Sequence, residues 1–493
     1  KIALIASEAV PWCKSGGLAD VVGALPRALQ EAANAAGESV EVALFLPMYR
    51  QVRQFIARHG HQVTDTGIAL RAPMGGGGEP FRLLHAYGRD GESVYFIDAP
   101  HRYDRDGLYD DADHRAFDDN GERFALLCRA ALEVMPRVMG GPPDILHVHD
   151  WQASLAPVYL KTRYRHAYPK TRSVLTIHNL AYQGVLPGSM RGALDIDASF
   201  LQPDRGEYYG NLNLLKGGMA YADAVTTVSP TYAREIRTPH YGCNLDGFVR
   251  AHVPVYGILN GIDTDAWNPA TDPLLPARYD ADHLEGKAVC RELLLEAAGL
   301  RPAPGEALLG VVSRFAGQKG IDLIAELVPH LHHLGARLVV LGDGDPELED
   351  RFRWLGWVFS HHITVRIGFD PALSHRLIAG CDALLMPSRF EPCGLTQLYA
   401  MRYGTVPIVH AVGGLRDTVV DPGDAGLAAG EGTGFRFEHP TPEGLGWALA
   451  RAVRMYRERP AGWRAIMQAG MRQDFSWARS AATYLELYRR LGG

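Results

Sequence analysis

Short apolar runs alternate with longer helical patterns along this chain, and this alternation restricts the fold more than any other feature. The first series of runs covers residues 1–6, 40–46, 145–149, 174–178, 224–228 and 255–259. The second series covers residues 308–313, 338–341, 363–367, 383–386 and 406–410. Near-continuous apolar runs of this length are typical of strands buried on both faces of a parallel sheet. The sequence therefore predicts an α/β fold with two doubly wound domains.

A connection rich in proline and aspartate, residues 263–278, separates the two series. We place the domain boundary just before it, which gives a first domain at residues 1–260 and a second at residues 261–476. The length of 493 residues suits this division, because single domains rarely exceed about 250 residues. Residues 477–493 show helical spacing of apolar residues and predict a C-terminal helix that packs back on the first domain.

Charge and cysteine content narrow the possible partners. A formal net charge of -6 gives no overall attraction for nucleic acid or for an anionic membrane. No stretch approaches the roughly 18 apolar residues that a membrane-spanning helix needs. The six cysteines are scattered and include no CxxC pair, which favours a reduced, cytoplasmic setting. We expect neither a nucleic-acid partner nor a membrane partner.

The segment after the first predicted strand has the composition of a diphosphate-binding loop. It contains Lys14, Gly16 and Gly17 and runs into a helical pattern. Ligands of open α/β sheets bind beyond the carboxyl ends of the strands, where glycine lets the backbone approach an anion and a helix N-terminus offers free N–H groups. The plain alternative is an ordinary strand-to-helix turn.

The second domain supplies further charged residues at strand ends. Arg314 and Lys319 follow the strand at residues 308–313, and two fixed cations can neutralise a diphosphate leaving group. Glu391 stands just ahead of Gly394, Leu395 and Thr396, where a helix would open toward phosphates while the carboxylate accepts sugar hydroxyls. The alternatives are solvated surface charges for the cations and a helix-dipole contact for the glutamate.

Read in order, these segments resemble the bacterial glycogen synthase and plant starch synthase family over essentially the whole chain. The matching blocks are KSGGLADV from Lys14, HVHDW from His147, TIHN from Thr176, LNGID from Leu259, SR with QKG from Ser313, and SRFEPCGL from Ser388. Ser15 departs mildly from the threonine that is common in the family. Six blocks in this order make the resemblance specific.

The resemblance implies the GT-B glycosyltransferase architecture, in which two Rossmann-like domains face a deep cleft. Acceptor glucan would bind mainly to the first domain and nucleotide to the second. The implied reaction moves glucose from ADP-glucose to the non-reducing end of an α-1,4-glucan such as glycogen, with retention of configuration and without a cofactor or an essential metal. The residues alone leave ADP-glucose and UDP-glucose open, and family membership favours ADP-glucose.

The resemblance also assigns roles to residues. It implies catalytic roles for Arg314, Lys319, Glu391, His178 and Asp150. It implies donor or substrate binding by Lys14, Gly16, Gly17, Asn260, Phe369, Cys393, Gly394, Leu395 and Thr396. Phe369 stands where relatives stack an aromatic ring, usually tyrosine, on the adenine. A phenylalanine at a strand end can also belong to the core.

Other functions and sites fit less well. A nicotinamide-dependent oxidoreductase would need a GxGxxG loop that is absent. The DxD pairs at residues 263–265 and 343–345 would hold a metal in a different glycosyltransferase fold, and His147 and His149 lack a third ligand at the usual spacing. A non-catalytic glucan-binding protein, or a related two-lobe transferase with another donor or a small acceptor, remains the alternative.

Overall fold

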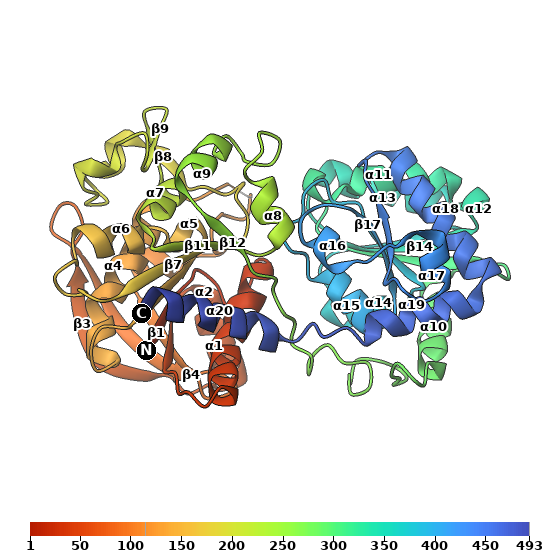
Figure 1. Cartoon of the computed structure of the whole chain (residues 1–493), viewed down its shortest axis with the longest axis horizontal. Coiled ribbons are helices and arrows are strands. Elements are labelled where there is room, and N and C mark those ends of the chain that lie inside the picture. The colour runs from red at the N-terminus through yellow and green to blue at the C-terminus, as the bar shows by residue number, and fades with distance from the viewer. Residues whose placement is uncertain (114, 493) are drawn as a thin grey trace. The chain divides into compact units, whose positions relative to one another are not determined.

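The computed structural model describes residues 1–113 and 115–492, so that Gly493, the last residue of the expected C-terminal helix, lies outside the described residues. Two compact units make up the chain: one comprises Lys1–Gly261 and Trp477–Gly493, and the other comprises Ile262–Ser476. Each unit has its own sheet and its own hydrophobic core (Figure 1). Among the described helices, none is long and apolar enough to cross a membrane.

The first unit contains a nine-stranded sheet in the order β12-β11-β7-β6-β1-β2-β5-β4-β3. Its strands are β1 (Ile2–Ile5), β2 (Val42–Pro47), β3 (Thr64–Ala72), β4 (Glu79–Tyr87), β5 (Ser93–Asp98), β6 (Ile145–His149), β7 (Arg172–Ile177), β11 (Ala224–Thr227) and β12 (Val255–Gly257). The seven strands from β12 to β5 are parallel to one another. β4 pairs antiparallel with β5, and β3 pairs antiparallel with β4. All six strands predicted in this part of the chain are therefore confirmed.

The sequence patterns missed β3, β4 and β5. The first two form a hairpin at the sheet edge, and their side chains alternate between exposed and covered positions instead of forming a continuous apolar run. The glycine run at residues 75–78 turns the chain between them, with positive φ at Gly76, Gly77 and Gly78. A small antiparallel sheet of β8 (Val185–Pro187), β10 (Asn211–Asn213) and β9 (Glu207–Tyr208) was also not predicted.

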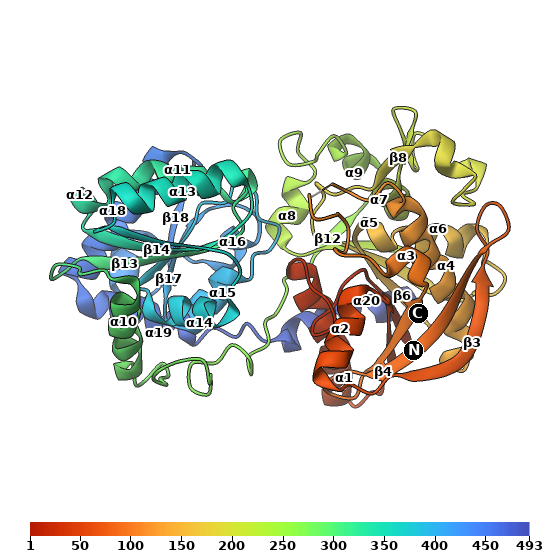
Figure 2. The ribbon, with the colours of Figure 1, turned by 180° about the vertical axis from the view of Figure 1, so that it is seen from behind.

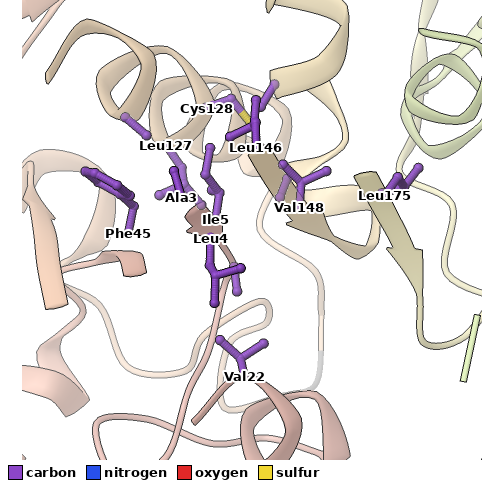
Figure 3. Close-up of a cluster of buried hydrophobic side chains, with 14 of the residues drawn as sticks. Ala3, Leu4, Ile5, Val22, Phe45, Leu127, Cys128, Leu146, Val148 and Leu175 are labelled. Carbon is purple, nitrogen blue, oxygen red and sulfur yellow. The ribbon is translucent and has the colours of Figure 1, made fainter. Parts of the chain in front are cut away.

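Helices cover both faces of the large sheet. They are α1 (Gly17–Ala35), α2 (Arg50–His59), α3 (Pro100–Tyr103), α4 (Asn120–Val138), α5 (Asp150–Ala153), α6 (Leu155–Thr162), α7 (Leu214–Tyr221), α8 (Pro230–Glu235), α9 (Asp246–His252) and α20 (Trp477–Gly492), with 3-10 turns η1 (Gly188–Arg191) and η2 (Ala198–Phe200). Leu4 of β1 points toward Val22 of α1, and Ile5 points toward Leu127 of α4 (Figure 3). The C-terminal helix α20 lies beside α1 (Figures 1 and 2).

The second unit contains a six-stranded parallel sheet in the order β15-β14-β13-β16-β17-β18. Its strands are β13 (Ala307–Val312), β14 (Ala336–Gly342), β15 (Ile363–Ile367), β16 (Ala383–Met386), β17 (Val406–His410) and β18 (Phe435–Phe437). The five predicted strands are present, and only the three-residue β18 was missed. The two faces of this sheet have separate hydrophobic cores: on β14, Val340 packs into one core and Val339 packs into the other.

The helices of the second unit complete a doubly wound fold. They are α10 (Glu285–Ala298), α11 (Ile321–Leu327), α12 (Leu331–Leu334), α13 (Pro346–Val358), α14 (Pro371–Gly380), α15 (Thr396–Arg402), α16 (Gly413–Thr418), α17 (Gly423–Ala428), α18 (Pro442–Glu458) and α19 (Pro460–Met471), with 3-10 turns η3 (Gly317–Lys319) and η4 (Val328–His330). In each unit the order of strands reverses direction at one place, between β1 and β6 in the first and between β13 and β16 in the second. Ligands of such sheets bind at these switch points, beyond the carboxyl ends of the strands.

Candidate functional site

The loop after β1 carries the predicted phosphate-binding residues of the first unit. Helix α1 begins at Gly17, and its N-cap Gly16 supplies no side-chain hydrogen bond to the first turn. A Cβ atom at Gly16 would meet no heavy atom within 4 Å. Lys14 Nζ lies 2.7 Å from both carboxylate oxygens of Asp20. The helix N-terminus is thus open to an anion, whereas the ammonium group already has a partner.

Glu8, three residues after the end of β1, is hydrogen-bonded to this loop. Its carboxylate accepts hydrogen bonds from the backbone N–H and the hydroxyl of Ser15, the latter at 3.1 Å. Burial raises the pKa of Glu8, and the hydrogen bonds from Ser15 oppose that shift. Glu8 was not among the site residues predicted from the sequence, although a carboxylate shortly after a buried strand was the available signal.

Asp150 follows β6, the strand next to β1, and has a left-handed backbone with φ of 56°. Its Oδ1 accepts a hydrogen bond of 2.7 Å from the backbone N–H of His178. Burial raises the pKa of Asp150 to about 7; the N–H groups of His178 and Asn179 lower it, and the negative charge of Glu8 raises it further. Aspartate tolerates positive φ better than most residues, so the conformation brings its carboxylate to the loop after β7.

His178, a predicted catalytic residue, has a second partner that the sequence analysis did not assign. Its Nε2 lies 3.0 Å from Nδ1 of His149, which is fully buried. Burial lowers the pKa of His178 to about 3 and the pKa of His149 well below its usual value. Both imidazoles are therefore neutral at physiological pH, and one donates a hydrogen bond to the other.

A third histidine extends this cluster toward the C-terminal helix. His147 lies 2.7 Å from the hydroxyl of Tyr488 on α20 and 2.6 Å from the hydroxyl of Thr176. Its ring centroid is 4.3 Å from that of His149. Both histidines are buried on β6. The described residues 1–113 and 115–492 contain no group of three His, Cys, Asp or Glu side chains that could hold a metal.

Asn260 lies between β12 and the end of the first unit. Its side chain is buried, and its Oδ1 atom has no hydrogen-bond partner within the described part of the chain. A buried amide oxygen without a donor is costly, since most buried polar atoms in folded proteins are paired. The geometry fits a ligand that supplies an N–H or O–H group, such as a sugar hydroxyl.

In the second unit, the loops after β13 and β16 bring a cation and a carboxylate together. Lys319 Nζ lies 2.6 Å from Oε2 of Glu391, and the hydroxyl of Ser388 donates to the same oxygen at 3.0 Å. Glu391 is buried, with 5% of its surface exposed. Arg314, by contrast, is exposed; its carbonyl oxygen accepts a hydrogen bond of 3.1 Å from the hydroxyl of Ser313, but its side chain forms no hydrogen bond or ion pair with any residue that the structure describes. Its guanidinium group is available to a ligand.

The loop after β17 packs against the backbone of Glu391. The N–H of Gly414 donates to the carbonyl of Glu391 at 3.1 Å. A Cβ atom at Gly413, where φ is 46°, would lie 1.9 Å from that carbonyl oxygen. Neither glycine was predicted as a site residue; a Gly-Gly pair shortly after a predicted strand was the signal for them.

The remaining donor-site candidates lie at the start of α15 and the end of β15. Cys393 is buried, Gly394 has φ of 72°, and Leu395 is the N-cap of α15, so Thr396 is its first residue. Phe369 follows the carboxyl end of β15 and is 78% exposed. The alternative that this phenylalanine belongs to the core is therefore wrong.

The two DxD pairs have local structural roles. Asp263 Oδ1 accepts hydrogen bonds from the N–H groups of Asp265 and Ala266, each at 3.0 Å. Asp345 caps the N-terminus of α13 by accepting a bond of 2.9 Å from the N–H of Glu347.

Comparison with known proteins decides the family. Residues 1–251 match the model of the starch synthase catalytic domain, and residues 296–464 match that of glycosyl transferases group 1. The chain belongs to the glycogen synthase and starch synthase family. The glycogen synthase of Roseobacter denitrificans is 44% identical, with 100% of both chains covered. That of Anaeromyxobacter dehalogenans (strain 2CP-C) is 46% identical, covering 100% of this chain and 99% of the relative.

Solved structures agree with this membership of the glycogen synthase family. The catalytic domain of starch synthase IV from Arabidopsis thaliana, bound to ADP and acarbose, matches with a TM-score of 0.88 and 33% identity over 100% of this chain and 99% of its own. Sucrose-phosphate synthase from Thermosynechococcus elongatus, at 19% identity and a TM-score of 0.59, shares the fold. The fold is GT-B, and this member of the family is a glucosyltransferase of glycogen synthesis.

Proposed function

We propose that this glycogen synthase transfers glucose from ADP-glucose to the non-reducing end of an α-1,4-glucan with retention of configuration. The bound ADP and acarbose of the Arabidopsis starch synthase support an adenine nucleotide and a glucan-like acceptor. Phe369, exposed beyond β15, offers an apolar face for the adenine ring. In this proposal the second unit binds the nucleotide and the first unit binds the acceptor.

The single observation that carries the proposal is the contact between Lys319 and Glu391. The pair joins a cation suited to the diphosphate and a carboxylate suited to sugar hydroxyls within 2.6 Å. Arg314 adds a second positive charge with no partner of its own among the described residues. As the bond between the anomeric carbon and the phosphate breaks, the two cations stabilise the negative charge that develops on the ADP. In this proposal Gly394, Leu395 and Thr396 complete the phosphate site of the second unit. The first unit offers its own phosphate-binding loop with Lys14, Gly16 and Gly17.

The first unit supplies sugar-binding groups in this mechanism. Asn260 Oδ1 accepts a hydroxyl, and Asp150, whose Oδ1 already accepts the N–H of His178, binds the sugar through its other oxygen. In the second unit, Cys393 is the further sugar-binding residue of this proposal. A retaining glycosidase would use a carboxylate nucleophile close to the anomeric carbon, but the backbone hydrogen bonds of Asp150 make it a poor one.

A front-face reaction needs no protein nucleophile. The bond from the anomeric carbon to the phosphate oxygen breaks, the acceptor 4-hydroxyl oxygen bonds to the same face of the carbon, and its proton passes to the departing phosphate. His178 supports the positive charge on the sugar through its backbone carbonyl, and its side chain contacts one sugar hydroxyl. We place this reaction in the cytoplasm, which fits the absence of a disulfide among the six cysteines, all of which are described.

The decisive experiment measures incorporation of labelled glucose into glycogen from ADP-glucose and, separately, from UDP-glucose. We expect strong incorporation from ADP-glucose and its loss in Glu391→Ala. Glu458→Ala is the matched control, because Glu458 is also a carboxylate of the second unit that pairs with a basic residue, Arg457, and neither of the two is a candidate site residue. Preference for UDP-glucose would correct the donor. Glycogen binding without incorporation from either donor would overturn the proposal.

A further inference from the structure

A cavity of about 370 Å³ lies within the first unit, between α8, the edge strand β12 and the C-terminal helix α20. None of the candidate residues for glucosyl transfer lines it. Pro230, Val255, Ile258 and Leu487 contribute apolar walls. Its volume is within the range of pockets that bind small molecules, roughly 300 to 1,000 Å³.

The charged residues that line this cavity are mostly basic. Arg234, Arg237 and Arg490 contribute guanidinium groups, and Glu486 is the one acidic residue among the lining residues. Three positive charges against one negative charge leave a local excess of two, in a chain whose formal net charge is -6. A local excess of opposite sign to the whole chain raises the concentration of small anions at that place.

The three arginines differ in whether their guanidinium groups already have a partner in the protein. Arg490 pairs with Glu486 on the same helix, and Arg234 donates to the hydroxyl of Thr231 at 2.8 Å. The guanidinium group of Arg237 has no hydrogen bond or ion pair to the residues that the structure describes. At least one of the lining guanidinium groups therefore has no acceptor among the described residues.

Two further features favour a ligand larger than a bare ion. β12 is the last strand of its sheet, so alternate backbone groups on its outer side have no neighbouring strand to pair with. Tyr256, which is 46% exposed, also lines the cavity. Tyrosine offers an apolar face together with a hydroxyl, which suits the body of a sugar or a similar polar ring.

We propose that this cavity binds a small phosphorylated metabolite of the sugar-monophosphate class. Arg237 and Arg490 would hold the phosphate, because the guanidinium fork matches phosphate oxygens in a bidentate manner. The wall formed by Tyr256 and the apolar side chains would cover the rest of the molecule. The proposal does not depend on the donor or on the mechanism of glucosyl transfer.

Isothermal titration of the full chain with ribose 5-phosphate, inorganic phosphate and ribose tests this site. We expect saturable binding of ribose 5-phosphate, weaker binding of phosphate and no binding of ribose. Arg237→Gln and Arg490→Gln should each weaken binding at least about tenfold, the loss of one charge-assisted contact. Arg457→Gln is the matched control, because Arg457 is 57% exposed and pairs with a glutamate, as Arg490 does, but lies in the second unit.

A second control separates this cavity from the candidate donor site. Lys319→Ala should leave the affinity for ribose 5-phosphate unchanged, and ADP should not displace it. Loss of binding in Lys319→Ala, or equal weakening by Arg457→Gln, would assign the phosphate to another site and overturn the proposal. Absence of saturable binding at millimolar ligand would overturn it as well. Circular dichroism of each variant checks that it is folded.

Discussion

Nδ1 of His149 lies 3.0 Å from Nε2 of His178, so a buried imidazole fixes the orientation of the side chain predicted to act on the sugar. We predict that His149→Leu lowers kcat about tenfold with a smaller change in KM for the donor, because His178 loses its positioning hydrogen bond. His149→Asn, whose amide can replace Nδ1 in that bond, should restore most of kcat. Equal kcat in the leucine and asparagine variants would show that the contact does not position His178.

The Lys319→Ala variant tests whether this lysine stabilises the negative charge on the leaving ADP. We predict that Lys319→Ala lowers kcat by about 10²- to 10³-fold, because the cation stabilises charge that develops in the transition state. The variant also leaves the buried Glu391 without its ion-pair partner, so the free energy of unfolding should fall, and urea unfolding must be measured alongside. A rise in donor KM with unchanged kcat would remove the leaving-group role.

The Gly413→Ala variant tests whether the contact between Gly413 and the backbone of Glu391 holds that loop in place. Alanine there would place Cβ 1.9 Å from the carbonyl oxygen of Glu391, so the loop carrying Glu391 must move. We expect Gly413→Ala to lose most of its activity and to lower the free energy of unfolding by about 2–4 kcal/mol, combining overpacking with positive φ.

The matched control for this change is Gly423→Ala. Gly423 also has positive φ, 86°, but a Cβ atom there would meet nothing within 4 Å. Its cost should be near 1 kcal/mol, the backbone effect alone, with unchanged activity. Similar losses of activity in both variants would mean that contact with Glu391 is not the cause.

Asp150 predicts a pH dependence of stability. Burial raises the pKa of Asp150 from 3.8 to about 7, so the folded chain binds this proton more tightly than the unfolded chain does. The resulting stabilisation is fully present below the unfolded pKa and disappears as pH rises through about 7. Urea unfolding between pH 4 and pH 8 should therefore show Asp150→Asn gaining stability relative to wild type as the pH rises. A constant difference across this range would show that the carboxylate has an ordinary pKa.

Metal dependence separates this mechanism from that of DxD glycosyltransferases. Asp263 and Asp345 serve a turn and a helix cap, and the mechanism assigns charge neutralisation to Arg314 and Lys319. We expect glucosyl transfer to be retained after dialysis against a chelator. Loss of activity that manganese restores would contradict the assignment.

The positions of the buried strands and the residue types of the site could be read from the sequence. Strands such as β1 and β13 are continuous apolar runs, because both of their faces are covered by helices. β3 and β4 were not predicted because one face of each strand is open to solvent. Exposed and covered residues therefore alternate along them, and no continuous apolar run is present. Motif blocks similarly indicated Arg314, Lys319 and Glu391, since charged residues in the loops that follow buried strands are visible without a structure.

Only the tertiary structure decided which of these residues touch. Lys319 and Glu391 are 72 positions apart, and they meet because β13 and β16 are neighbours in the sheet. The same holds for Gly413, which packs against Glu391 from the loop after β17, and the neighbouring strands β1 and β6 bring Asp150 within the electrostatic influence of Glu8. Strand order is set by long-range packing of helices on both sheet faces, and local sequence does not encode it. The sequence determined the chemistry that is available, and the order of the strands determined where that chemistry comes together.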